Sequence, residues 1–126
     1  DGDDIVIGAD TVVALDGKIL GKPKSEENAR EMLRFLSGRT HSVFTGVTLA
    51  NNKKTKTFAV ETKVKFFELT NEETEAYIKT KEPFDKAGAY GIQGYGSLLV
   101  EKIDGDYFNV VGLPVSTLAR ELKAFE

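Results

Sequence analysis

The chain has 126 residues, enough for one domain with a hydrophobic core but too few for two. Its 40% hydrophobic and 29% charged residues are typical of a globular protein, and no apolar run approaches the roughly 20 residues of a membrane span. The absence of cysteine excludes disulfides, thiolate metal sites and cysteine nucleophiles. The net charge of −3 disfavours a nucleic-acid partner, and we expect a cytoplasmic protein without membrane contact.

Residues 5–9 form a short, unbroken apolar run. Such a run predicts a strand that is buried on both faces, as in parallel or mixed sheets. Asp10 and Thr11 follow at the expected end of this strand. Because ligands collect beyond the carboxyl ends of strands in open α/β sheets, the Asp10 carboxylate is a candidate functional group. An aspartate that only caps a turn is the alternative.

An Asp-Gly pair at 16–17 separates two further apolar runs and predicts a two-residue hairpin turn. Extended along both strands, this register places Thr11 opposite Lys22. Directly opposed side chains lie about 4.5–5.5 Å apart, so we expect Asp10, Thr11 and Lys22 to lie close together at one end of the hairpin. A carboxylate, a hydroxyl and an ammonium group suit phosphate chemistry. A plain structural ion pair is the competing explanation.

Capping and periodicity signals predict the remaining elements. Ser25 and Thr70 match helix N-caps, and Pro114 matches a first helical position. The predicted elements are helices over 26–37, 71–80 and 114–125, and strands over 40–50, 56–69, 97–103 and 107–111, the last two joined by a hairpin turn at 104–105. Together these patterns predict a single α/β domain over 1–126, with a mixed, twisted sheet and flanking helices. The lone His41 is expected to have a surface or capping role.

Four of the twelve glycines fall within residues 85–96, which also contain Asp85, Lys86 and Gln93. Glycine lets the backbone adopt positive φ and approach a neighbour closely. Two interpretations follow. The stretch is either a loop shaped around a ligand or a tight bend packed against another element, and composition favours neither.

Five stretches resemble the Maf family in order and spacing. They are Gly8-Ala9-Asp10-Thr11-Val12-Val13, Gly21-Lys22-Pro23, Leu36-Ser37-Gly38-Arg39-Thr40-His41, Asp85-Lys86-Ala87-Gly88-Ala89-Tyr90-Gly91-Ile92-Gln93-Gly94 and Gly112-Leu113-Pro114. The resemblance implies an α/β fold shared with inosine triphosphate pyrophosphatases. It also implies hydrolysis of nucleoside triphosphates between the α- and β-phosphates, with a divalent cation such as Mg²⁺ or Mn²⁺.

The resemblance further implies a set of site residues, namely Asp10, Thr11, Lys22, Asp85, Lys86 and Gln93. Asp10 corresponds to the family's proton acceptor and Lys22 to a phosphate-site lysine. Thr11 and Gln93 correspond to residues that set nucleotide specificity. The neighbouring Asp-Lys pair at 85–86 is assigned to substrate binding, and the two aspartates are assigned to the cation.

The motifs at 10–11 and 89–93 are similar to those of the branch that acts on dTTP and UTP, whereas the branch that acts on 7-methyl-GTP has Asp-Gln at the first place. The expected partner is therefore a nucleoside triphosphate, with a homodimer as a further expectation. The alternative function is a regulator of cell division and septum formation, in which nucleotide binding matters more than turnover.

One family feature is not found in this sequence. Family members begin with a strand and a Ser-x-Ser-Pro-Arg-Arg loop that supplies phosphate-binding arginines. The arginines of this chain are Arg30, Arg34, Arg39 and Arg120, none adjacent to another. We therefore expect the chain to correspond to the C-terminal two-thirds of a Maf protein, and we do not expect full activity from these residues alone.

Overall fold

The computed structural model describes residues 4–126 and contains a five-stranded sheet with the order β2-β1-β3-β4-β5. The strands are β1 (Val6–Leu15), β2 (Lys18–Leu20), β3 (Thr40–Ala50), β4 (Thr55–Phe66) and β5 (Val100–Asp104). The pairings within residues 4–126 are all antiparallel, whereas the sequence predicted a mixed sheet. Antiparallel strands can follow one another through short turns, as β1–β2 and β3–β4 do, whereas parallel neighbours need a long crossover.

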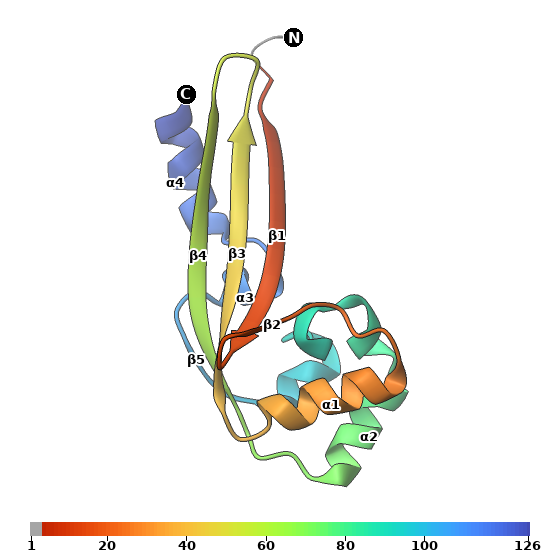
Figure 1. Cartoon of the computed structure of the whole chain (residues 1–126). Coiled ribbons are helices and arrows are strands. Elements are labelled where there is room, and N and C mark those ends of the chain that lie inside the picture. Colours follow the sequence, from red (N-terminus) through yellow and green to blue (C-terminus); the bar gives the residue numbers. More distant parts are fainter. Residues whose placement is uncertain (1–3) are drawn as a thin grey trace.

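Four α-helices and three short 3₁₀ helices accompany the sheet, which confirms the α/β class. They are α1 (Glu26–Leu36), α2 (Asn71–Lys79), η1 (Glu82–Asp85), η2 (Ala87–Ala89), η3 (Gly94–Leu99), α3 (Tyr107–Val111) and α4 (Val115–Phe125). The long strands β1, β3 and β4 run side by side, with α4 along their upper half and α1 and α2 gathered at the lower end (Figure 1). Within residues 4–126, no helix has the length and apolar character needed to span a membrane.

The predicted caps of α1 and α2 are confirmed. The Ser25 side chain accepts a hydrogen bond from the backbone N–H of Asn28 at 3.0 Å. Thr70 and Glu73 form a reciprocal capping box, in which each side chain bonds the other's backbone N–H. Both caps satisfy amide groups that have no partner inside the helix, which explains why these helices begin where the sequence predicts.

The predicted second hairpin after β5 is wrong, because residues 107–111 form the helix α3. The Asp106 side chain accepts a hydrogen bond from the backbone N–H of Phe108 at 2.9 Å and so caps this helix. The backbone N–H of Asp106 also donates to the hydroxyl of Thr62 on β4. An Asp-Gly pair normally favours a hairpin, but here the following aspartate starts a helix instead.

One face of the sheet carries both hydrophobic clusters of the described residues. On β3, every second residue from His41 to Leu49 is buried, as the predicted alternation requires. The first cluster joins Val43 to α1 and α2, and the second joins Val47 to α4. The other residues of β3 are only half-buried or exposed.

The first strand is not buried on both faces as predicted. Val6 and Ile7 are 69% and 45% exposed. β1 pairs with β3 along its length, but within residues 4–126 it has no strand on its other side before Val13.

His41 is buried, with only 1% of its surface exposed, so the prediction of a surface or capping role was wrong. Its Nε2 atom lies 2.7 Å from the Tyr90 hydroxyl, and its ring meets the rings of Tyr90 and Phe66 edge to face. Burial lowers the pKa of His41 to about 4, because the charged imidazolium would lose its hydration. The folded protein therefore holds this histidine in its neutral form.

The burial of His41 should make the folding stability of the protein depend on pH. The unfolded chain binds a proton at His41 below about pH 6.5, whereas the folded chain does so only below about pH 4, so folding stability is lost as the pH falls through this window. The expected loss is roughly 3 kcal/mol in the free energy of unfolding. Urea unfolding at several pH values between 7.5 and 4 measures it. The variant His41→Gln should lack this component, and equal pH dependence in both proteins would contradict the assignment.

Candidate functional site

A cavity of about 470 Å³ lies beside β1. On β1 it is lined by residues 10–13. β2 pairs with β1 only at three positions, between Val13–Leu15 and Lys18–Leu20. Beyond Leu20 the chain leaves the sheet, and the Gly21 carbonyl accepts a hydrogen bond from the backbone N–H of Gly88 at 3.0 Å. This separation of two chain segments opens the cavity along the edge of β1.

All the residues predicted for the site line this one cavity, namely Asp10, Thr11, Lys22, Asp85, Lys86 and Gln93. β1 contributes the first two, the segment after β2 contributes the lysine, and the glycine-rich loop contributes the other three. Apolar side chains, including Val12, Ile92 and Val110, form much of the remaining wall. The structure therefore brings the predicted groups together, while their chemical roles stay predictions.

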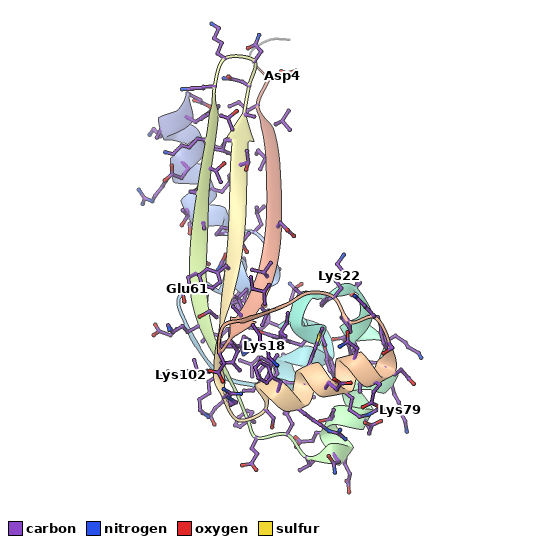
Figure 2. The ribbon with its side chains drawn as sticks, viewed as in Figure 1. Asp4, Lys18, Lys22, Glu61, Lys79 and Lys102 are labelled. Carbon is purple, nitrogen blue, oxygen red and sulfur yellow. The ribbon has the colours of Figure 1, made fainter. Side chains whose placement is uncertain are left out.

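The hairpin at 16–17 is confirmed, but its register does not extend to Lys22. Asp16 and Gly17 both have positive φ, 52° and 77°, as a type I′ turn requires. The ladder ends at Leu20, so Thr11 and Lys22 are not a cross-strand pair. Lys22 reaches the cavity from the segment that joins β2 to α1, where Figure 2 labels it.

Asp10 and Thr11 project from opposite faces of β1, because successive side chains of a strand alternate. Asp10 pairs with Gly46 and is exposed, and it lies within β1 rather than at the strand end predicted for it. Thr11 pairs with Thr45 on the covered face, with their hydroxyl oxygens 2.9 Å apart. Both residues nevertheless line the cavity.

A series of buried hydrogen bonds connects Thr11 to the helix α3. The Thr45 hydroxyl donates to the backbone carbonyl of Asn109 at 3.2 Å, in addition to its contact with Thr11. Asn109, on α3, is fully buried, and its side-chain nitrogen, which carries two N–H groups, lies 3.0–3.1 Å from three acceptors, the carbonyls of Val43 and Val60 and the hydroxyl of Thr62. Sequence patterns did not reveal Asn109, because they placed this residue in a strand. A buried amide with this many partners holds α3, and with it the rim at 110–112, against the sheet.

Asp85 and Lys86 form an ion pair at the mouth of the site, with Nζ and Oδ1 3.0 Å apart. The hydrogen bond from Lys86 lowers the pKa of Asp85, so this carboxylate is ionised at neutral pH. Because solvent reaches both side chains, the pair contributes little to folding. The charges are therefore available to an incoming ligand.

The glycine-rich loop combines the two interpretations that the sequence left open. A Cβ atom at Gly88, where φ is +72°, would lie 2.9 Å from Val13 of β1. A Cβ atom at Gly96 would lie 1.7 Å from the carbonyl oxygen of Gly91, within the same loop. These glycines are thus required by close packing. The loop that they shape nevertheless lines the cavity with Asp85 and Gln93.

Replacing Gly96 by alanine should disrupt this loop. The added methyl group would overlap backbone that cannot move aside without opening the bend, so we expect a loss of about 3 kcal/mol or more in the free energy of unfolding. Gly8→Ala is the matched control, because no atom lies within 4 Å of the position that its Cβ would take, and its effect should stay within about 0.5 kcal/mol. Chemical denaturation measures both values. Equal stability of the two variants would mean that the loop tolerates a side chain at Gly96.

Comparison with known proteins agrees with these motifs. A family model described as Maf-like protein matches residues 1–125. The chain belongs to the Maf family. The resemblance that the five motifs carry is thereby confirmed, and the Maf assignment extends over almost the whole chain.

Curated Maf relatives are similar along the same range. A Bacillus cereus protein named dTTP/UTP pyrophosphatase is 57% identical over 124 residues, which cover 98% of this chain and 65% of that protein. A Bacillus cytotoxicus protein of the same name is 59% identical over 122 residues, which cover 97% of this chain and 64% of that protein. The chain thus spans slightly less than two-thirds of the length of these relatives.

Proposed function

We propose that this chain acts in the hydrolysis of nucleoside triphosphates, preferably dTTP and UTP, to the monophosphate and pyrophosphate. The observation that carries the proposal is the cavity that unites Asp10, Lys22, Lys86 and Gln93. Relatives more than half identical to the chain are named dTTP/UTP pyrophosphatase, which supports the same reaction here.

Charge and proton transfer define the proposed chemistry. A triphosphate repels a nucleophile, so the site must neutralise phosphate charge and position a water molecule. Asp10 is an exposed carboxylate on the cavity wall and would accept the proton of that water. Lys22 and Lys86 would stabilise the negative charge that develops on the leaving pyrophosphate.

A divalent cation fits the oxygen donors of this cavity. Asp10 and Asp85 both line it, and carboxylate oxygens are the ligands that Mg²⁺ and Mn²⁺ prefer. Within residues 4–126 no group of three or more acidic or histidine side chains is arranged to hold a metal ion. The two carboxylates would therefore share the cation with phosphate oxygens and water, as is usual for Mg²⁺. The bound cation would neutralise phosphate charge.

Gln93 and Thr11 are the groups proposed to contact the base. The Gln93 amide offers a donor and an acceptor together, which suits the edge of a pyrimidine. The Thr11 hydroxyl is already hydrogen-bonded to Thr45, so its orientation is set by the buried hydrogen bonds that connect it to α3. Hydrogen-bonding groups in such a site discriminate between bases because a wrong base leaves them unpaired.

The variant Asp10→Asn tests the proposed reaction. Loss of the general base should lower kcat by about 10²–10⁴-fold, while the exposed position of the side chain predicts an unchanged fold. Pyrophosphate release from dTTP and UTP gives the rates, and circular dichroism checks the fold. Near-normal kcat in a folded variant would refute the role of Asp10. Tight nucleotide binding without turnover in the wild-type protein would favour the alternative, a nucleotide-binding regulator of septum formation.

Lys22→Ala tests the phosphate contact against a close control. Lys22 lines the cavity, whereas Lys24, two residues further along the same segment, does not. We expect Lys22→Ala to lower kcat/KM by roughly 10²-fold, the usual order for one lost charge-stabilising group, and Lys24→Ala to have no effect. Steady-state kinetics with dTTP provides both values. Similar losses in the two variants would indicate general electrostatic attraction rather than a specific contact.

The same proposal includes a cytoplasmic location and a homodimer. Light scattering of the purified protein tests the dimer, and cell fractionation tests the location.

A further inference from the structure

A carboxylate that does not line the cavity holds the backbone of the glycine-rich loop. The two carboxylate oxygens of Glu82 accept hydrogen bonds from two backbone N–H groups of the loop. Oε2 accepts from Tyr95 at 3.0 Å, and Oε1 accepts from Gly96 at 3.2 Å. A single carboxylate thus holds two consecutive amides, an arrangement that a neutral side chain with one acceptor oxygen cannot reproduce.

Tyr77 holds a third amide of the loop. Its hydroxyl accepts a hydrogen bond from the backbone N–H of Gly91 at 3.1 Å. Burial raises the pKa of Tyr77, and the neighbouring Glu82 carboxylate raises it further. The phenol therefore keeps its proton, which it can donate to Glu82 while it accepts from Gly91. We call Glu82 and Tyr77 together the loop clamp.

The three amides held by the loop clamp surround Gln93 in the sequence, two residues before it and two and three residues after it. The Gln93 side chain is exposed, and within residues 4–126 it makes no hydrogen bond of its own. Its placement at the cavity therefore depends on the backbone that carries it. That backbone is fixed by Glu82 and Tyr77, neither of which lines the cavity.

The conformation of the loop requires such support. Lys81, directly before Glu82, has φ +68°, and Ala89 has φ +67°, values that L-residues rarely adopt. Residues in these conformations cost about 1–3 kcal/mol each and persist only where surrounding contacts hold them. The loop clamp supplies contacts of this kind directly after Lys81 and two residues after Ala89.

We propose that Glu82, with Tyr77, is a positioning residue for Gln93, and that it sets the base selectivity of the site without touching the substrate. This inference rests on the proposed function, because it assigns the base contact to Gln93. It predicts that loss of the clamp disturbs discrimination between bases more than it disturbs the phosphate chemistry at Asp10 and Lys22.

The test compares Glu82→Gln and Tyr77→Phe with the control Glu31→Gln, which removes the same charge from the exposed surface of α1. The protein is used as the cell makes it, and kcat/KM is measured for dTTP, UTP and dGTP. Because displacement of a contact group by about 1 Å can change rates about 10²-fold, we expect the pyrimidine-to-purine ratio to fall by about tenfold or more in both clamp variants. The ratio should stay at the wild-type value in the control, and kcat for dTTP should change less than the ratio.

Amide hydrogen exchange provides the second measurement and needs no substrate. Gly91, Tyr95 and Gly96 should lose protection in Glu82→Gln, whereas the amides of β3 should not. An unchanged selectivity ratio in a folded, active clamp variant, or unchanged protection of the three amides, would overturn the inference. If Glu82→Gln does not fold, the same measurements on Tyr77→Phe test the inference. This variant keeps the ring and removes only the hydroxyl. If the wild-type protein does not hydrolyse triphosphates, the proposed function is refuted. The exchange data would still show whether Glu82 and Tyr77 hold the loop backbone.

Discussion

The short pairing between β1 and β2 is the constraint on which the site depends. Three residue pairs hold the hairpin, and then Gly21 bonds to Gly88 of the glycine-rich loop instead of to β1. An edge strand normally presents unpaired backbone groups that attract another strand. Here that edge becomes one wall of a cavity, so side chains from both faces of β1 can border the same space.

The opposite wall depends on packing rather than on pairing. Gly88 lies against Val13 so closely that any side chain at this position would force the loop away from β1. On the far side of the loop, Tyr77 and Glu82 hold the backbone around Gln93. The loop is thus fixed on both sides, by van der Waals contact at the sheet and by hydrogen bonds at α2 and η1. Rigid support of this kind keeps polar groups in place for a ligand.

Much of the fold could be predicted from local signals, because each signal acts within a few residues, whereas the full set of site residues came from the resemblance of five motifs to the Maf family. The Asp-Gly turn at 16–17, the cap at Ser25 and the alternation of β3 all appear in the structure. The errors concern residues whose state is decided by distant parts of the chain. His41 is buried because Tyr90 and Phe66 pack on it, and Asn109 is helical and buried because β3 and β4 supply its acceptors.

The charge balance of the cavity bears on the form in which a nucleotide would arrive. Among the described residues that line the cavity, the charged side chains are two aspartates and two lysines, which sum to zero. A free triphosphate would therefore meet no net positive charge from these residues and would face repulsion from Asp10. A triphosphate that carries a divalent cation presents less negative charge and offers the two carboxylates a partner. In the proposed reaction, the two lysines would then stabilise the charge that develops on the leaving pyrophosphate.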